Sequence, residues 1–477
     1  MYSATTSVAL VGGDVRPVEV QVHVGSQAEQ FKLSGLADTA VREAKDRVRA
    51  AVASSGIKFP NRTVTVNLAP AHLPKTGTDF DLAIAIGVLA ASREIPDPGR
   101  AVMVGELALD GTLRNGSASI GAAVLSARAG IPCLVARGAA PEVAAVPGSK
   151  VHGVASLADA VALLREGIET RPAATPESGL DPAGYGDLAE VRGQGLARKA
   201  IEVAAAGGHH VLLHGPPGGG KTMLARRLPG ILPPLGDGEA VEVALVHAAA
   251  GLNRGLSRSR PFRSPHHTAS RAALVGGGSG VAVPGEVSLA HRGVLFVDEM
   301  AEFPRANLDT LRQPLEDGRV TVARRGITAT FPSSFHLVGA TNPCPCGYLG
   351  DRRKPCECRP AVVSRYRQRV SGPLLDRFDL VVKVDRLEAG DMSQPEPDSS
   401  IVVRERVAEA HARLENTPPT LSPDADGLLI TALGNGLLTA RGVDRVRRVA
   451  MTICALSGHE VVDESHVAEA IGLRGEW

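Results

Sequence analysis

The chain has 477 residues, with 52 Lys and Arg against 51 Asp and Glu, and carries a formal net charge of +1 at pH 7. Its hydrophobic content of 44% excludes a wholly disordered protein, and its length predicts two or three domains. A nearly neutral chain must hold any polyanion through local basic patches. Its 9 Phe, 4 Tyr and 1 Trp are few for a nucleic-acid binder that works mainly by base stacking.

The sequence contains no segment with the properties of a membrane anchor. The longest strongly apolar stretch, Ala83 to Ala91, is much shorter than the roughly 20 residues of a membrane-spanning helix. The first residues lack a basic leader followed by a sustained apolar core, so no signal peptide is expected. We therefore expect a cytoplasmic protein without a membrane partner.

Five segments differ in periodicity and in Pro, Gly and Ser content. Residues 1–164 alternate β-branched runs, such as VEVQVHV and VTVNL, with helical spacing, which predicts a mixed α/β domain. Residues 191–386 alternate apolar strands with helices, as in a parallel sheet, and residues 401–477 are predicted to be helical. The polar, Pro-containing segments 165–190 and 387–400 are predicted to be linkers. The predicted fold class is multidomain α/β.

A nucleotide site is predicted at the start of the second domain. The strand predicted over Val211–His214 runs into GPPGGGKT, which matches the P-loop pattern G-x-x-x-x-G-K-[ST] and precedes a helical run. Backbone N–H groups and the helix dipole would surround the phosphates of ATP, Lys221 would reach the terminal phosphates and Thr222 would ligate Mg²⁺. The predicted nucleotide-binding residues are Gly215, Pro216, Pro217, Gly218, Gly219, Gly220, Lys221, Thr222 and Met223.

Polar residues follow two further predicted strands. The buried-type strand Val294 to Val297 ends in Asp298 and Glu299, where a Walker B pair would hold Mg²⁺ and orient the attacking water. The strand His336 to Ala340 is followed closely by Asn342. Since carboxyl ends of parallel strands share one edge of a sheet, we expect these side chains beside the nucleotide.

Hydrolysis also needs a cation on the charge that develops on the γ-phosphate, and an arginine in this role is worth roughly 10³ to 10⁵ in rate. Two arginines are candidates. Arg377 precedes a predicted strand, and Arg441 begins a predicted helix in the last segment. Arg445 and Arg448 lie with Arg441 on one face of that helix, and we expect both of them to be solvated.

Four of the six cysteines lie within fifteen positions. This clustering favours metal binding over a disulfide framework. Four thiolates could hold a structural Zn²⁺ that fixes the loop after Asn342. Because the C-x-C spacing is tighter than usual in zinc sites, free thiols are the alternative. The four residues are Cys344, Cys346, Cys356 and Cys358.

Two basic elements are candidates for DNA contact. The stretch Arg254 to Gly285 has five arginines and no acidic residue, and VTVARRGITATF predicts a hairpin with two arginines at its tip. Such groups would hold phosphates without reading bases, with strong salt dependence. The alternative is that the arginines form salt bridges between subunits. The predicted DNA contacts are Arg263, His266, His267, Arg324 and Arg325.

Together, GPPGGGKT, VLFVDEM, SRPFRSPHHTASRAALVGGGSG, GATNPCPCG and SGPLLDRFDL resemble the magnesium-chelatase-like AAA+ ATPases, specifically the YifB/ComM group, over essentially the full length. The resemblance implies an AAA+ core with a helix-2 insert at 254–285, a helical lid and a hexameric ring. It also implies Asn342 as sensor 1, Arg377 as a finger in the neighbour's site and Arg441 as sensor 2. ComM-like proteins are ATP-driven helicases that move branched DNA during recombination in natural transformation, so sequence-independent binding of single-stranded or branched DNA is expected.

The N-terminal domain resembles the proteolytic domain of Lon protease, whose pattern P-K-x-G-x-S carries the nucleophilic serine. This chain reads PKTGTD, with Asp79 in place of the serine, and the general-base lysine aligns with about Ile120. Because neither half of the dyad is present, no protease activity is expected. Two alternatives to a DNA motor are a magnesium-chelatase-like motor subunit for metal insertion and a protein-remodelling AAA+ ATPase.

Overall fold

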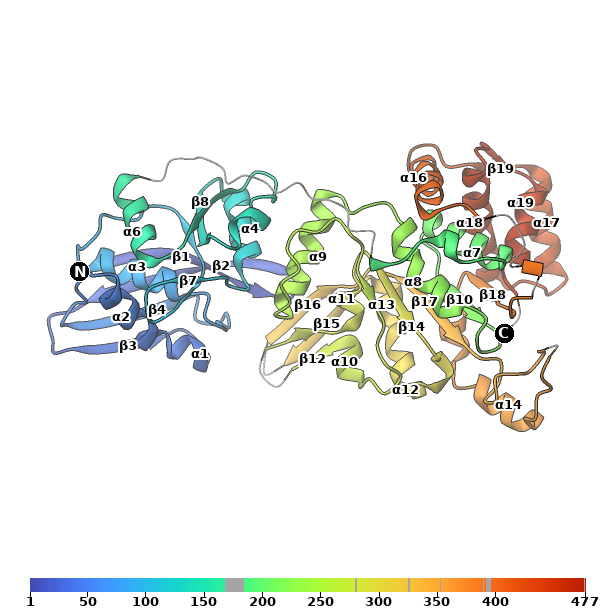
Figure 1. Ribbon diagram of the computed structural model, residues 1–477, viewed down its shortest axis with the longest axis horizontal. Coiled ribbons are helices and arrows are strands. Elements are labelled where there is room, and N and C mark those ends of the chain that lie inside the picture. The colour runs from blue at the N-terminus through green and yellow to red at the C-terminus, as the bar shows by residue number, and fades with distance from the viewer. Residues whose placement is uncertain are drawn as a thin grey trace.

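The computed structural model describes residues 1–167, 184–278, 281–324, 327–351, 353–388, 390–391, 396–475 and 477. Much of segment 165–190 and part of segment 387–400, both predicted to be linkers, lie outside the described residues. The chain is elongated, with an N-terminal α/β unit at one end, a central unit on a parallel sheet and a group of helices at the other end (Figure 1). Among the described helices, none combines the length and apolar character needed to cross a bilayer.

The N-terminal unit is built on a seven-stranded sheet of order β3-β4-β2-β1-β5-β8-β9. The alternation in VEVQVHV and VTVNL correctly predicts β2 and β4, whose apolar residues face the core in an antiparallel pair. Helix α3 is buried almost all round, which explains its continuous apolar run. The strands are β1 Tyr2–Val11, β2 Asp14–Val24, β3 Gln30–Ser34, β4 Thr63–Ala69, β5 Val102–Met103, β6 Glu106–Leu107, β7 Leu113–Arg114, β8 Pro132–Ala136 and β9 Lys150–Val154. The helices are α1 Thr39–Arg42, α2 Ala44–Ser54, α3 Asp81–Ala91, α4 Ser119–Ala129, α5 Ala140–Val143 and α6 Leu157–Glu166.

The central unit is a five-stranded sheet of order β11-β14-β17-β10-β18, in which every neighbouring pair is parallel. Both faces are covered, so successive strand residues enter different hydrophobic cores: Leu213 faces α7 and α8, and Leu212 faces the opposite layer. The strands are β10 Val211–His214, β11 Phe262–Arg263, β14 Val294–Val297, β17 His336–Thr341 and β18 Leu380–Lys383. The helices are α7 Gly195–Gly207, α8 Lys221–Ile231, α9 Asp237–Ala249, α10 Arg271–Val275, α11 Glu286–Leu289, α12 Arg305–Leu308, α13 Arg312–Asp317, α14 Pro360–Arg367 and α15 Gly372–Leu375, with short 3₁₀ turns at Leu188–Glu190, Met300–Glu302 and Asp309–Leu311.

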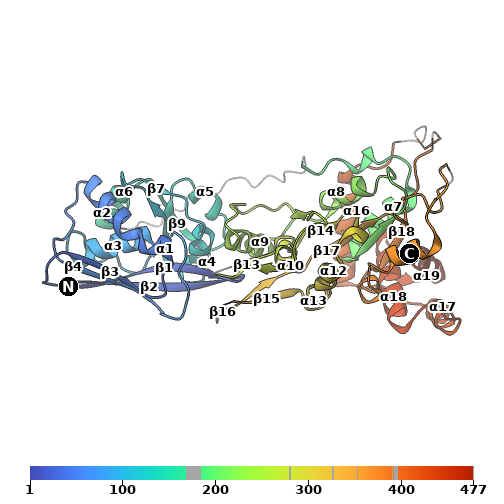
Figure 2. The ribbon, with the colours of Figure 1, turned by 90° about the horizontal axis from the view of Figure 1, so that it is seen from below.

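Two hairpins project from this sheet toward the N-terminal unit. The short one pairs β12 Gly276–Gly277 with β13 Val283–Pro284, and the longer one pairs β15 Arg319–Arg324 with β16 Ile327–Pro332, as predicted from VTVARRGITATF. The turn of the β1–β2 hairpin reaches β16, where the Gly13 N–H donates to the Thr330 carbonyl at 3.0 Å (Figure 2). A Cβ on Gly12 would lie 2.4 Å from the same carbonyl oxygen, so this contact requires glycine.

Helix α9 also joins the N-terminal and central units. Its Ala244 and Leu245 are buried in one hydrophobic core with Val8, Val15 and Ile120 of the N-terminal unit. The N-terminal unit is therefore packed against both α9 and the β15–β16 hairpin, and not only tethered by the chain.

The C-terminal unit is helical and packs on α7 and α8 through α16 and α18. Helix α18 has a polar face and a buried apolar stripe, and the Thr439 hydroxyl caps it by accepting from the Gly442 N–H at 3.1 Å. The helices are α16 Ser400–Asn416, α17 Pro423–Gly434, α18 Ala440–Leu456 and α19 Glu464–Gly472, with a small ladder of β19 Thr420–Leu421 and β20 Val461–Val462.

A buried carboxylate joins this helical unit to the sheet. Asp379, just before β18, lies 3.4 Å from Arg445 and 3.1 Å from Arg448 on α18, and 3.6 Å from His209 before β10. The prediction that Arg445 is solvated was wrong, because its side chain is only 11% exposed, whereas Arg448 is 61% exposed. Burial would raise the pKa of Asp379, but the hydrogen bond and charge of His209, with other nearby positive charges, hold it well below its usual range.

We expect Asp379→Asn to destabilise the protein by about 3 kcal/mol, because Arg445 and His209 would be left without their counter-charge. The exposed Asp376→Asn in the same turn is the matched control. The check is urea unfolding at several pH values. Because the carboxyl pKa is depressed on folding, its contribution is complete above the ordinary value of about 4 and is lost as the pH falls through the folded value. A difference between variant and wild type that persists unchanged into acid would contradict this account.

Candidate functional site

The P-loop connects β10 to α8 and has the geometry of a phosphate cradle. Gly215, Gly218 and Gly220 have φ angles of 155°, 79° and 92°. A Cβ on Gly215 would lie 2.0 Å from the Val384 carbonyl oxygen, so the first position of the motif admits only glycine. Lys221 begins α8, and its Nζ donates to the carbonyls of Gly215 and Pro216 at 2.7 and 2.9 Å. Burial lowers the pKa of Lys221 to about 8.

The residues predicted after β14 and β17 converge on this loop. Thr222 Oγ1 donates to Asp298 Oδ2 at 2.9 Å, and Lys221 Nζ lies 3.2 Å from Asn342 Oδ1. The parallel register explains this, since β10, β14 and β17 end at the same edge of the sheet. A hydroxyl and a carboxylate at this spacing are oxygen donors of the kind that Mg²⁺ prefers. Met223, one residue further along α8, is 43% exposed.

Glu299 has an unusual backbone that turns its side chain outward. Its φ of 49° lies in the left-handed region, its N–H donates to Asp298 Oδ1 at 2.9 Å, and its carboxylate is 57% exposed. Strained backbone of this kind is typical of functional sites. His267 Nδ1 lies 3.6 Å from Glu299 Oε2, and the His266 and His267 rings are 4.1 Å apart. The two histidines predicted to contact DNA therefore border the nucleotide site.

The basic stretch 254–285 is largely paired within the subunit. Phe262–Arg263 forms β11, the edge strand of the core sheet, and does not belong to a projecting insert. The Arg263 guanidinium makes two hydrogen bonds, of 2.6 and 2.7 Å, with the Glu286 carboxylate, so it is paired within the subunit, and the DNA contact at Arg263 stays a prediction. Arg324 ends β15, and Arg325 lies outside the described residues.

Arg377 lies at the amino ends of the sheet strands (the amino edge), whereas the P-loop lies at their carboxyl ends (the carboxyl edge). It precedes β18, whose Leu380 pairs with Val211 at the start of β10, whereas the P-loop follows the end of β10. The four residues of β10 thus separate Arg377 from its own P-loop by roughly 13 Å. Within the subunit Arg377 pairs with Glu316 on α13. Burial lowers the pKa of Arg377, and repulsion from the nearby Arg441 and Arg312 lowers it further. The exposed Arg441 therefore lies near the same edge of the sheet as Arg377.

Sequence reasoning missed two residues that contact the P-loop. Gln194 adopts a left-handed conformation with φ of 55°, and its side-chain amide donates to the Gly219 carbonyl at 3.2 Å. Arg386 Nε donates to the Pro217 carbonyl at 3.3 Å. The only available signal for Gln194 was its position directly before a helix. In a single sequence, many polar residues without a role at the P-loop stand at such positions. A cavity of about 210 Å³ beside the loop is lined by Pro216, Asp351, Arg353, Asp385, Arg386, Glu388 and Asp391.

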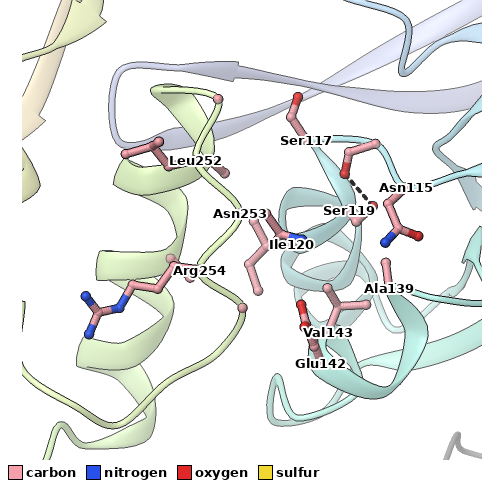
Figure 3. Close-up of a pocket in the computed structure, with 15 residues that line it drawn as sticks. Asn115, Ser117, Ser119, Ile120, Ala139, Glu142, Val143, Leu252, Asn253 and Arg254 are labelled. Atoms are coloured by element: carbon pink, nitrogen blue, oxygen red, sulfur yellow. Dashed lines mark hydrogen bonds between the residues drawn. The ribbon is translucent and has the colours of Figure 1, made fainter. Parts of the chain in front are cut away.

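Asp79 and Ile120, the two positions at which the sequence resemblance would place a Ser/Lys dyad, are both buried. Asp79 accepts hydrogen bonds from Ser117 Oγ at 2.8 Å and from the Ala118 N–H at 3.3 Å, and burial raises its pKa. Ile120 lines a cavity of about 190 Å³ between α4 and the loop after α9, facing Asn253 (Figure 3). Neither Asp79 nor Ile120 supplies an activated hydroxyl or amine for acyl transfer.

The four clustered cysteines lie together directly after Asn342, with their sulfurs within 4.8 Å of one another. The two remaining cysteines, Cys133 and Cys454, are buried in other units.

Three family models match successive stretches of the chain: subunit ChlI of Mg-chelatase at residues 18–137, magnesium chelatase subunit ChlI at 187–392 and the ChlI C-terminal model at 416–474. An uncharacterized protein of Mycobacterium tuberculosis is 44% identical over 98% of this chain and 97% of its own length. YifB of Escherichia coli and the competence protein ComM of Haemophilus influenzae are each 39% identical, over 98% of this chain and 96% of their own lengths. The chain therefore belongs to the YifB/ComM family of magnesium-chelatase-like, AAA+-type ATPases.

Proposed function

We propose that this protein is an ATP-driven, ring-forming motor that moves along DNA and promotes branch migration during recombination of incoming DNA. The observation that carries the proposal is the division of the site between two edges of one sheet. Lys221, Thr222, Asp298 and Asn342 gather at the carboxyl edge, where ATP and Mg²⁺ would bind, while Arg377 lies at the amino edge.

This division favours a ring of identical subunits. If Arg377 cannot reach its own P-loop, it can complete the site only of a neighbouring subunit. Such a contact joins two different surfaces, and repeated contacts of this type close into a ring or continue as a filament. We propose a homohexamer in which Arg377 and Arg441 both face the neighbour's nucleotide.

The proposed chemistry divides among the residues at the carboxyl edge. Thr222 and Asp298 would hold the Mg²⁺ of ATP, Glu299 would orient the attacking water, and Lys221 and Asn342 would contact the γ-phosphate. When bound, the metal neutralises charge on the phosphates. Arg377 would then stabilise the charge that develops as the terminal phosphate leaves.

The longer hairpin offers a route from the ATP site to DNA. Helix α13 carries Glu316, the partner of Arg377, and leads through Asp317 and Gly318 into β15. A change in the pairing of Arg377 would therefore act on β15, the strand that ends at Arg324. We propose that Arg324 and Arg325 of each subunit contact DNA phosphates in the ring.

The test is ATPase activity with and without forked or single-stranded DNA, together with a branch-migration assay on a four-way junction. We expect DNA to stimulate hydrolysis. The double variant Arg324→Ala/Arg325→Ala should reduce that stimulation and the salt dependence of DNA binding, with the exposed Arg100→Ala as control. Stimulation only by a protein partner would instead indicate remodelling, and stimulation only by a tetrapyrrole-bearing subunit would indicate metal insertion.

We expect His267→Ala to lower kcat by roughly 10-fold to 100-fold, because Glu299 would lose the neighbour that orients its carboxylate. His266→Ala is the matched control, since His266 contacts Thr268 and not Glu299. The rates are measured with and without DNA. A loss confined to the DNA-stimulated rate would mean that His267 contacts DNA and would contradict the role proposed here.

We also propose that residues 1–164 form a Lon-protease-like unit that acts in assembly and has no protease activity. The buried Asp79 and Ile120 support this proposal. This unit packs on α9 and contacts Thr330 of β16. These contacts support a role in holding the β15–β16 hairpin in place. The test is casein hydrolysis by the purified chain, for which we expect no activity.

A further inference from the structure

Four cysteines form a compact group beside the nucleotide site. The Cys344 and Cys346 sulfurs are 3.3 Å apart, and the Cys356 sulfur lies 3.7 Å from the first and 3.6 Å from the second. The Cys358 sulfur completes the group, in which all four sulfurs lie within 4.8 Å of one another. Cys344 is buried and the other three are half-buried.

These separations match a tetrahedral site for one metal ion. Zinc–thiolate bonds of about 2.3 Å place neighbouring sulfurs of a tetrahedron about 3.8 Å apart. The separations between Cys344, Cys346 and Cys356 are well above the roughly 2.05 Å of a disulfide bond. An iron–sulfur cluster would spread its four thiolates over more than one iron, which does not fit so compact a group.

The cysteine loop packs directly on the P-loop. Gly347 has φ of 84°, and a Cβ there would lie 2.8 Å from Pro217 Cδ, so the loop backbone lies against this P-loop proline. Arg386 bridges the two loops, because its Nε donates to the Pro217 carbonyl at 3.3 Å and lies 3.3 Å from Asp351. Two cations lie over the Tyr348 ring: the Lys354 ammonium is 4.2 Å from the ring centroid, and the Arg386 guanidinium is 5.3 Å from it.

We propose that Cys344, Cys346, Cys356 and Cys358 bind one structural Zn²⁺, which fixes the loop after Asn342 and thereby holds the P-loop in its phosphate-binding shape. Among the described residues of 345–351 and 353–359 only Gly347 is buried, and the sequence of this segment carries two carboxylates and four basic residues. A loop of this composition cannot be held in one conformation by a hydrophobic core. A metal ion bound by cysteines at both ends of the loop would fix its conformation instead. The effect on the P-loop rests on the proposed nucleotide site, whereas zinc binding does not.

Zinc content is measured by elemental mass spectrometry on the purified full-length chain, before and after incubation of the reduced protein with zinc. We expect one zinc per chain in the wild type and its loss in Cys346→Ser and Cys356→Ser. Cys133→Ser and Cys454→Ser, which alter buried cysteines outside the group, should retain it. A reduced wild-type chain that holds no zinc and takes up none would overturn the site, as would equal loss in the control variants.

Coupling to the P-loop is measured as the affinity for a fluorescent, non-hydrolysable ATP analogue with Mg²⁺. We expect removal of zinc by a chelator to weaken binding by about 10-fold or more, and added zinc to restore it. This treatment uses the wild-type chain, so it does not depend on the folding of a variant. Unchanged affinity in a zinc-free chain of unchanged circular dichroism would overturn the coupling.

Lys221→Ala separates this inference from the proposed function. It should abolish binding of the analogue and still retain one zinc per chain, because Lys221 contacts none of the four sulfurs. If the wild-type chain binds zinc but no nucleotide, the proposed function fails and the zinc site stands. If it binds nucleotide but no zinc, the opposite holds.

Discussion

Arg377→Ala is expected to abolish ATP hydrolysis and to leave nucleotide binding intact, lowering kcat by roughly 10³-fold to 10⁵-fold. Arg377 lies at the amino ends of the strands, separated from its own P-loop by the four residues of β10, so its removal should not change the P-loop. The measurements are steady-state ATPase rates and the affinity for a fluorescent ATP analogue. Arg100→Ala, an exposed arginine of the N-terminal unit, is the control for loss of a positive charge.

A mixing experiment tests whether Arg377 acts on the neighbouring subunit. Lys221→Ala lacks a working P-loop but has Arg377, and Arg377→Ala has the opposite defect. In a ring assembled at random from equal amounts, about a quarter of the interfaces join an intact P-loop to an intact arginine. The mixture should therefore regain activity that neither variant has alone. A mixture as inactive as its components, in rings of verified mixed composition, would mean that the two residues do not share a site across the interface.

The parts of the site that could be predicted are those in which local sequence determines local geometry. GPPGGGKT places a lysine at the start of a helix after a buried strand, and the glycines follow from the φ angles that the loop needs. Asp298 and Asn342 could be added because parallel strands end at one edge of a sheet. These inferences need no knowledge of distant contacts.

The structure contradicts the predicted solvation of Arg445, and the sequence did not reveal several contacts between residues that lie far apart in the chain. Arg263 and Arg445 were interpreted by their charge, but Glu286 and Asp379 neutralise them inside the subunit. His267 was grouped with nearby arginines, whereas folding places it beside Glu299. Charge patterns along a sequence do not reveal which partner a side chain meets, and this limits the prediction of binding surfaces.

The two loops that shape the nucleotide site illustrate the same limit. The clustering of four cysteines predicted a common metal site, because spacing alone brings such residues together. Nothing in the sequence indicated that the cysteine loop packs on Pro217 or that Arg386 bridges Pro217 and Asp351. These contacts depend on the order of strands in the sheet, which places the loop after β17 next to the loop after β10.

Glu299→Gln is expected to bind ATP and Mg²⁺ nearly as tightly as the wild type and to hydrolyse ATP roughly 10²-fold to 10⁴-fold more slowly. The amide keeps the size of the side chain but cannot accept a proton from the attacking water, whereas Thr222 and Asp298, which would hold the metal, are unchanged. The Glu299 carboxylate is 57% exposed and lies beside His267, away from the hydrophobic core, so stability should be unaffected.

Lys221→Ala provides the contrast, because it removes the ammonium that would reach the phosphates and should abolish ATP binding itself. If assembly depends on ATP between subunits, Glu299→Gln should accumulate as rings with ATP, while Lys221→Ala should not. The measurements are light scattering coupled to size-exclusion chromatography and the nucleotide content of the eluted protein. Wild-type hydrolysis by Glu299→Gln would assign the water-orienting role to another group, and weak ATP binding by this variant would place Glu299 among the metal-holding residues instead.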